Sequence, residues 1–179
     1  MISKIEKEFT FQTAIHFQNK FMINLYEMNL IMSINTVDPE DQNTAIERLS
    51  YFIGSALEDS IFVEDKEKEV IETYAKAGIK VITVPEEPYD QIIGLILLNK
   101  FNSIMENRIV VTDMILGSKL SNLIKFHLND ETASLEFSGK HWWNESSTNT
   151  ENKKSKKDKI VKLFDKKNDW EELELTWKK

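Results

Sequence analysis

The feature that most limits how this chain can fold is a polar, lysine-rich stretch that begins at Ser146. It has almost nothing to bury, so it cannot offset the conformational entropy lost on folding. Every longer apolar run that suits a core ends by Trp143. We therefore predict three parts: an acidic α+β domain over residues 1–145, a disordered polar linker over 146–159, and a short interaction segment over 160–179.

The net charge of −7 is divided unevenly between these parts. Residues 1–145 hold 13 Lys/Arg and 23 Asp/Glu, whereas residues 146–179 hold 10 Lys and 7 Asp/Glu. An acidic domain disfavours nucleic acid as a partner, because non-specific binding depends on neutralising phosphates. Arginine binds phosphates and base edges better than lysine, because its planar guanidinium can donate two parallel hydrogen bonds. The chain has only two arginines and 21 lysines. The composition suits a cationic partner or simply solubility.

Several classes of protein are disfavoured by what the sequence lacks. There is no cysteine, which excludes disulfides and thiolate chemistry. Glycine-rich phosphate loops, dinucleotide motifs and serine-hydrolase motifs are absent, so we expect no cofactor. The longest apolar run, residues 92–98, is far too short to span a membrane, and the first residues lack a signal-peptide core. We expect a cytoplasmic protein with no membrane partner.

Hydrophobic periodicity predicts an α+β fold. We expect a mostly antiparallel sheet, in the order β-β-α-α-β-α-β-β-β, with helices packed on one face. A change of phase near Tyr26-Glu27 indicates a β-bulge or a strand that swaps faces, and we favour a long bulged second strand, paired antiparallel to the first. The expected strands cover residues 8–17, 21–34, 79–84, 109–116, 123–128 and 133–137, and the expected helices cover 38–57, 65–77 and 89–107.

The third expected helix is the most apolar part of the chain. Residues 92–98 leave it few polar faces, which is typical of a helix at the centre of a core. The first helix has clear start signals, because Asp38 can cap it and Pro39 fits its first turn. We expect the third helix to lie between the other elements.

One candidate surface is an acidic run that includes Glu58, Asp59, Glu64 and Asp65 and continues to Glu72. Such a run can imitate nucleic-acid phosphates and occupy a basic groove on another protein. The alternative is a solvated helix face, with acids favoured near the helix start. Both interpretations place these carboxylates at the surface.

A second candidate is a set of four carboxylates, Glu86, Glu87, Asp90 and Asp113. Carboxylates at neighbouring strand ends can hold Mg²⁺ for phosphoryl chemistry, so a Mg²⁺-dependent enzyme is one alternative function. The first three also lie where a helix start favours acids. No catalytic lysine or histidine spacing accompanies them, and we expect no metal site.

The three histidines give no local metal motif. His16, His127 and His141 are too far apart in sequence for ligand pairs at i+3 or i+4. His16 and His127 fall in expected strands and could meet across the sheet. We expect ordinary half-buried sheet residues.

Trp142 and Trp143 are a candidate aromatic binding site. In a strand they would point to opposite faces, so one ring would be exposed to stack on a base or fill a partner's pocket. Together with the lysine-rich linker they define another alternative, a protein that binds single-stranded nucleic acid. The competing interpretation is that both rings fold back over the edge of the sheet.

The end of the chain carries apolar and aromatic residues beyond the expected linker. On a helix Trp170, Leu173 and Trp177 share one face, as in peptides that bind grooves. Added β-strand pairing and docking on the chain's own domain are the other modes. The predicted partner-binding residues are Ile160, Leu163, Phe164, Trp170, Leu173 and Trp177.

These observations favour a non-enzymatic adaptor or modulator that binds a larger protein assembly. The acidic domain would supply one contact and the terminal segment another, since two linked weak sites gain avidity through effective concentration. The abundance of Lys, Ile and Asn fits an AT-rich genome, and we expect a phage-like or mobile-element accessory protein.

Overall fold

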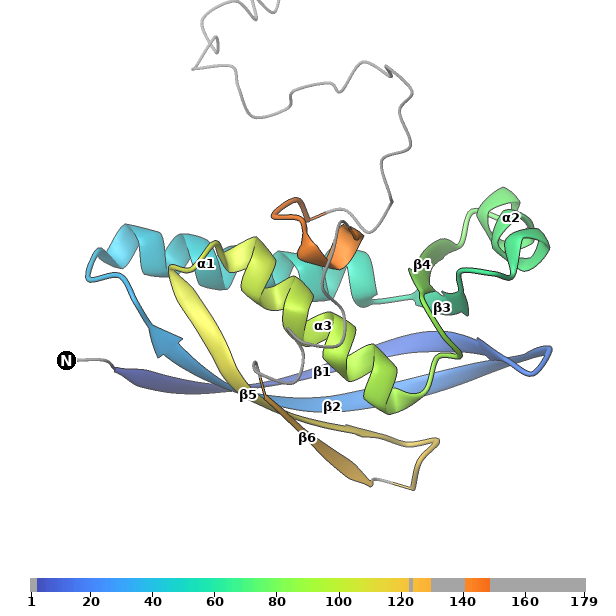
Figure 1. Ribbon diagram of the computed structural model, residues 1–179, viewed down its shortest axis with the longest axis horizontal. Coiled ribbons are helices and arrows are strands. Elements are labelled where there is room, and N and C mark those ends of the chain that lie inside the picture. The colour runs from blue at the N-terminus through green and yellow to red at the C-terminus, as the bar shows by residue number, and fades with distance from the viewer. Residues whose placement is uncertain (1–2, 123, 130–140, 149–179) are drawn as a thin grey trace, which may run out of the picture.

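Two long antiparallel strands form the centre of the sheet in the computed structural model, which describes residues 3–122, 124–129 and 141–148 (Figure 1). Strand β1 (Lys4–Phe17) pairs with β2 (Lys20–Ile34) along its whole length. Their two-residue turn has positive φ at Gln18 (49°) and Asn19 (59°), as in the type I′ turns that suit the twist of a hairpin. The strand predicted at 133–137 lies outside the described residues.

The sheet has six strands in the order β4-β3-β1-β2-β5-β6. The pairs β1–β2, β2–β5 and β5–β6 are antiparallel, whereas β1–β3 and β3–β4 are parallel. The α+β class is therefore confirmed, with a mixed sheet in place of a largely antiparallel one. The remaining strands are β3 (Ser60–Glu64), β4 (Lys80–Val84), β5 (Ile109–Ser118) and β6 (Lys125–Asn129).

Strand β3 was not predicted from the sequence. Its five residues, Ser-Ile-Phe-Val-Glu, are buried on both faces except at Glu64. A short apolar run without alternation cannot be distinguished from buried helix by periodicity alone. Burial on both faces is what a strand gains from lying inside a parallel part of a sheet.

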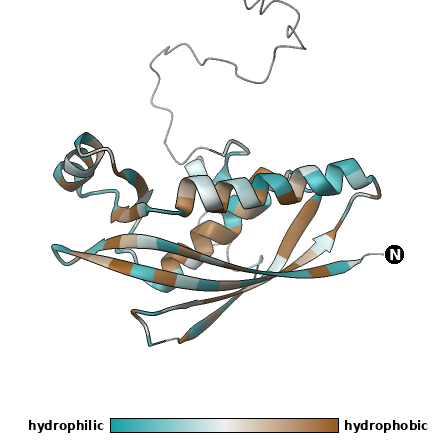
Figure 2. Cartoon of the chain, turned by 180° about the vertical axis from the view of Figure 1, so that it is seen from behind, coloured by the Kyte–Doolittle hydropathy of each residue, from teal (hydrophilic) through white to brown (hydrophobic). Residues whose placement is uncertain are grey.

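Two helices cover one face of the sheet. Helix α1 (Pro39–Phe52) is capped by Asp38, whose Oδ1 accepts from the Glu40 N–H at 2.9 Å, and it ends in a π-helical turn over Ile53–Leu57. Helix α3 (Asp90–Met105) lies between α1 and the sheet (Figures 1 and 2). Figure 2 shows α3 as largely hydrophobic and α1 as more hydrophilic, so the prediction of a central third helix is confirmed. Within the described residues, no helix is long and apolar enough to cross a membrane.

Helix α2 (Lys68–Lys76) packs on the opposite face, at the end of the sheet formed by β3 and β4. Alternate strand residues divide between the two faces. Phe62 and Ile82 belong to the main core under α1 and α3. Ala14, Ile61 and Val63 contact Val70, Ile71 and Tyr74 of the α2 helix in a smaller cluster.

The predicted β-bulge near Tyr26-Glu27 is wrong. Even-numbered residues from 24 to 32 are buried along all of β2, so the strand keeps one phase. The misleading signal came from Phe21 and Ile23, which face the other side and are 52% and 62% exposed. The irregularity lies in β5, where Thr112 is an extra residue between the partners of Ile31 and Met32.

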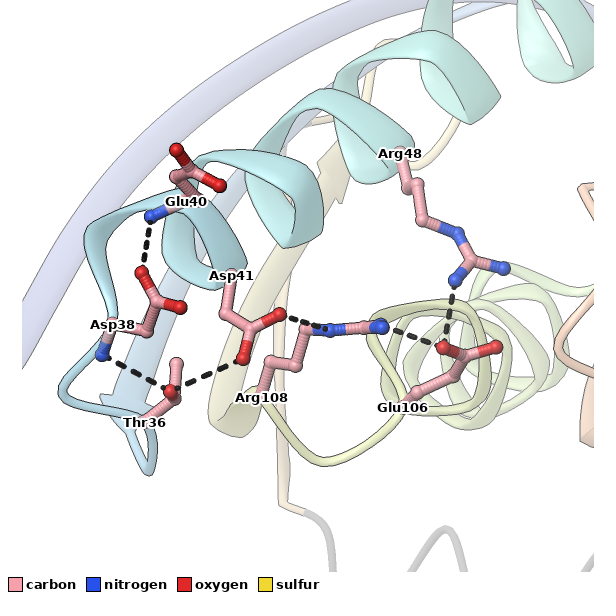
Figure 3. Close-up of polar contacts among 7 residues, drawn as sticks. All are labelled: Thr36, Asp38, Glu40, Asp41, Arg48, Glu106 and Arg108. Carbon is pink, nitrogen blue, oxygen red and sulfur yellow. Dashed lines mark hydrogen bonds and ion pairs between the residues drawn. The ribbon is translucent and has the colours of Figure 1, made fainter. Parts of the chain in front are cut away.

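A chain of ion pairs joins α1 to the end of α3 (Figure 3). Arg108 Nε lies 3.2 Å from Asp41 Oδ1, and its Nη1 lies 2.6 Å from Glu106 Oε2. Arg48 Nη1 reaches the same Glu106 oxygen at 2.9 Å. We call Asp41, Arg48, Glu106 and Arg108 the arginine network, and it uses both arginines of the chain.

Residues 141–148, which we call the strap, lie against α3 and are held by a buried lysine. Lys100 Nζ donates to the carbonyl oxygens of Trp142 (2.7 Å), Glu145 (2.8 Å) and Ser147 (2.6 Å). Burial lowers the pKa of Lys100 to about 8. Contacts of the domain thus extend past residue 145, the predicted boundary.

Candidate functional site: an acidic pocket at the strand ends

Three strands end at the same edge of the sheet because β1, β3 and β4 are parallel. Their last residues are Phe17, Glu64 and Val84. The chain then continues into the Gln18-Asn19 turn, the start of α2 and the loop that leads to α3. Loops that leave the carboxyl ends of parallel strands are where ligand sites commonly form in open sheets.

A pocket opens between these three segments. Three of its eight lining residues are glutamates, and none of the eight is lysine or arginine. We call it the acidic pocket. It is lined by His16, Phe17, Gln18, Asn19, Glu64, Glu67, Glu87 and Pro88.

His16 connects the acidic pocket to α2. Its Nδ1 lies 3.0 Å from the Tyr74 hydroxyl, and the two rings meet edge to face with centroids 5.7 Å apart. Its Nε2 lies 3.5 Å from Glu67 Oε2 and is a buried atom with no hydrogen-bond partner. Since the side chain is only 10% exposed, this nitrogen has no bulk water to bond to.

The other two glutamates have exposed partners. Glu64 Oε1 lies 2.8 Å from Nζ of Lys66, whose side chain is 75% exposed. Glu87 Oε2 accepts from the Tyr89 hydroxyl at 2.6 Å. The hydrogen bond to Glu64 raises the pKa of Lys66, and the hydrogen bond to Glu87 raises the pKa of Tyr89. Each shift arises mainly from a single contact with a pocket carboxylate.

Four aromatic side chains surround the same end of the sheet. Phe17 lines the pocket and meets Tyr89 edge to face at 5.2 Å, and Phe21 lies 6.2 Å from Tyr74. Phe21 and Tyr89 are each 52% exposed. We call Phe17, Phe21, Tyr74 and Tyr89 the aromatic rim.

The structure divides the acidic run predicted from the sequence. Glu64 reaches the acidic pocket. Glu58 and Asp59 precede β3 at its opposite end, where Glu58 Oε2 accepts from the Gln12 N–H at 3.2 Å and Asp59 N donates to the Gln12 carbonyl. Asp65 is exposed just beyond β3. The run is therefore not one surface.

The four carboxylates weighed as an alternative metal set, Glu86, Glu87, Asp90 and Asp113, form no such set in the described part of the chain. Asp90 accepts from the Tyr26 hydroxyl at 3.0 Å and from the Ser118 hydroxyl at 2.6 Å. Burial and the nearby Asp90 raise the pKa of Tyr26. Asp113 is five residues from Ser118 along β5, or roughly 16 Å, so it lies well away from Asp90, which is bonded to Ser118. Among the described residues, no group of three or more His, Asp or Glu side chains is arranged to hold a metal ion.

Trp142 and Trp143, the candidate residues for stacking on a base or filling a partner's pocket, are not exposed. Both side chains are buried, at 0% and 4% exposure, and Trp142 Nε1 donates to the Thr83 carbonyl at 3.0 Å. His141 stacks on Trp143 with centroids 4.3 Å apart, whereas His127 is exposed on β6. These rings offer no free face for a base. The predicted partner-binding residues Ile160, Leu163, Phe164, Trp170, Leu173 and Trp177 lie outside the described residues.

Comparison with known proteins supports the fold and does not assign an activity. No protein-family model matches the chain, and no curated protein matches its sequence. An uncharacterized protein from Wolinella succinogenes has a similar fold, with a TM-score of 0.50 and 13% identity over 73% of this chain and 99% of that one. Structures of 6-pyruvoyltetrahydropterin synthase from Plasmodium vivax give a TM-score of 0.44 and 14% identity over 72% and 99%. At 13% identity the likeness to the Wolinella succinogenes protein concerns the fold alone.

Proposed function

We propose that this protein is a non-enzymatic adaptor that binds a larger protein assembly, with the acidic pocket as the contact made by its folded domain. The observation that supports this proposal is the lining of the pocket. Three glutamates from two separate segments line one space, and its described lining includes no lysine or arginine. The one lysine that pairs with these carboxylates, Lys66, is exposed and lies outside the lining, so the pocket suits a cationic group supplied by a partner.

The surroundings of the pocket also suit a protein partner. Exposed aromatic side chains are enriched at the energetic centres of interfaces. The exposed Tyr89 packs against Phe17 of the pocket wall, and the exposed Phe21 packs against Tyr74, which contacts His16. The charged pocket would attract an oppositely charged partner and speed its association. The neighbouring aromatic side chains would then bury apolar surface in the complex. The tail would supply the second contact, through residues 160–179.

The test is capture of the partner from cells that produce the protein. The first variant carries Glu64→Gln, Glu67→Gln and Glu87→Gln. Its matched control carries Glu8→Gln, Glu47→Gln and Glu69→Gln at exposed positions outside the pocket, so both variants have the same net charge. We expect the pocket variant to lose most of the captured protein while the control keeps it.

A third chain ending at Thr148 separates the tail from the domain, because it retains the whole strap. We expect weaker capture from this chain and none when it also carries the pocket changes. Equal capture by the pocket variant and its charge-matched control would contradict the proposal.

A further inference from the structure

We infer that the group received by the acidic pocket is the side chain of an arginine in the partner. This inference rests on the proposed function and specifies its chemistry. Glutamates alone would attract any cation. Three features of the pocket select among cations: the free nitrogen of His16, the number and spread of acceptors, and the aromatic rim.

Among the described residues, none makes a hydrogen bond to Nε2 of His16. Nε2 and Glu67 Oε2 lie 3.5 Å apart without hydrogen-bond geometry. The Tyr74 hydroxyl can donate to Nδ1 or accept from it, so this bond does not set which ring nitrogen carries the proton. With the proton on Nδ1, Nε2 and the Glu67 carboxylate are both acceptors, and an N–H donor that enters the pocket beside them would bond to either.

The number and spread of acceptors favour a guanidinium over an ammonium. The lining offers three carboxylates and the His16 ring, distributed over three segments of the chain. A guanidinium carries five N–H donors in a fixed plane, whereas an ammonium carries three on one atom. Acceptors on different sides of a pocket match the first geometry.

The aromatic rim points to the same group. Phe17 forms part of the pocket wall, with Tyr89 edge to face against it. A guanidinium is weakly hydrated and stacks on aromatic faces, whereas an ammonium or a small metal ion holds its water more strongly. A pocket that combines carboxylates with an aromatic wall therefore favours arginine.

The experiment titrates the full-length protein with three short peptides of one sequence whose central residue is arginine, lysine or citrulline. Citrulline keeps the shape of arginine and lacks its charge. Affinity is measured by calorimetry, and the signals of the His16 ring are followed by NMR. We expect the arginine peptide to bind at least tenfold more tightly than the lysine peptide, to shift the His16 signals, and to lose binding when citrulline replaces arginine.

Two variants test the assignment within the pocket. Glu67→Gln should weaken the arginine peptide about tenfold, because it removes a charged acceptor beside His16. Glu47→Gln, an exposed change outside the pocket, should leave the affinity unchanged. Thermal unfolding of both variants confirms that the fold is retained.

Other outcomes overturn the inference in distinguishable ways. Equal or tighter binding of the lysine peptide would identify an ammonium site. Saturable binding of Mg²⁺ that shifts the His16 signals and displaces the arginine peptide would identify a metal site. If no peptide binds at millimolar concentration, arginine is excluded. The proposed function then stands or falls separately, on whether partner capture depends on the three pocket glutamates.

Discussion

The arginine network and the acidic pocket are both clusters of charged side chains at the margin of the core, but their charges are matched differently. In the network, two arginines meet two carboxylates, and Glu106 accepts from both arginines (Figure 3). In the pocket, three glutamates face one exposed lysine outside the lining and a histidine that makes no hydrogen bond to them. Within the described residues, the charges of the first cluster are matched and those of the second are not.

This difference distinguishes charges that support the fold from charges kept for another molecule. Carboxylates that gain internal partners should stabilise the folded state, whereas like charges gathered without partners should weaken it slightly. Stability measurements can therefore test the comparison without knowledge of any ligand. The predicted changes in the free energy of unfolding are largest for substitutions in the core. They are smaller for Lys100 and the arginine network, and smallest for the acidic pocket.

The largest effect is expected from Leu97→Ala in the buried face of α3. Removing this side chain should lower the free energy of unfolding by about 2–5 kcal/mol, because transfer and cavity costs add in a packed core. Denaturant unfolding measures it. This value sets the scale for the charged residues, and a midpoint equal to wild type would show that α3 is not the centre of the core.

The next effect is expected from Lys100→Met, which leaves three strap carbonyls without their donor. A loss of about 1–3 kcal/mol follows from unsatisfied buried acceptors. The strap should also become accessible to protease, which can be followed by mass spectrometry. Unchanged protection of residues 141–148 would show that Trp142 and Trp143 hold the strap without the lysine.

Lys100 also predicts a pH dependence of stability. Its pKa is lowered to about 8 in the folded state, against about 10.4 for a free lysine. Between these values the unfolded chain holds more protons, so the contribution of this group to the unfolding free energy rises with pH from about 8 to about 10. Subtracting the Lys100→Met profile from that of wild type isolates the contribution. A difference that falls over this range would have the wrong sign.

A smaller effect is expected from Arg108→Met in the arginine network. Hydrogen bonds from Arg108 lower the pKa of Glu106. A carboxyl with a lowered folded-state pKa stabilises the protein above its unfolded pKa of about 4.3 and loses this contribution as pH falls through its folded pKa. Because the pairs are partly exposed to solvent, we expect a loss near pH 7 that is smaller than that of Lys100→Met and shrinks below pH 4. A loss that is constant across this range would attribute the effect to packing.

The smallest effect is expected from the triple change Glu64→Gln, Glu67→Gln and Glu87→Gln. Removing like charges should leave stability unchanged or raise it by up to about 0.5 kcal/mol. The control with Glu8, Glu47 and Glu69 changed to Gln has the same net charge. It therefore separates the loss of repulsion within the pocket from the effect of the change in net charge. A marked loss of stability in the pocket variant alone would end the distinction between the two clusters.

The sequence predicted those elements whose periodicity is strong. The β1–β2 hairpin, α1 with its Asp38 cap, and the apolar α3 follow from local pattern and capping chemistry. Strand β3 did not, since burial on both faces removes alternation. The parallel order of β1, β3 and β4 was lost with it, and that order brings the pocket together.

The sequence therefore indicates the pocket residues one at a time and does not show which of them lie together. Glu64 and Glu87 were both noticed, but as members of separate sequence clusters. His16 was noticed without its partners Glu67 and Tyr74, which lie on α2 or at its start. Lys100 was missed, although a lone lysine within an apolar helix is a signal that it has buried acceptors.

The joint between β1 and β3 is only two residue pairs long, Ala14 with Ile61 and Ile15 with Phe62. A ladder this short can open locally while the long β1–β2 hairpin stays intact. The two sides of the pocket can then separate without unfolding of the whole domain. Hydrogen exchange at β3 would report this opening. A ligand that bridges Glu67 and His16 would close it, and slower exchange at Ile61 and Phe62 would be the sign that binding joins the two parts of the sheet.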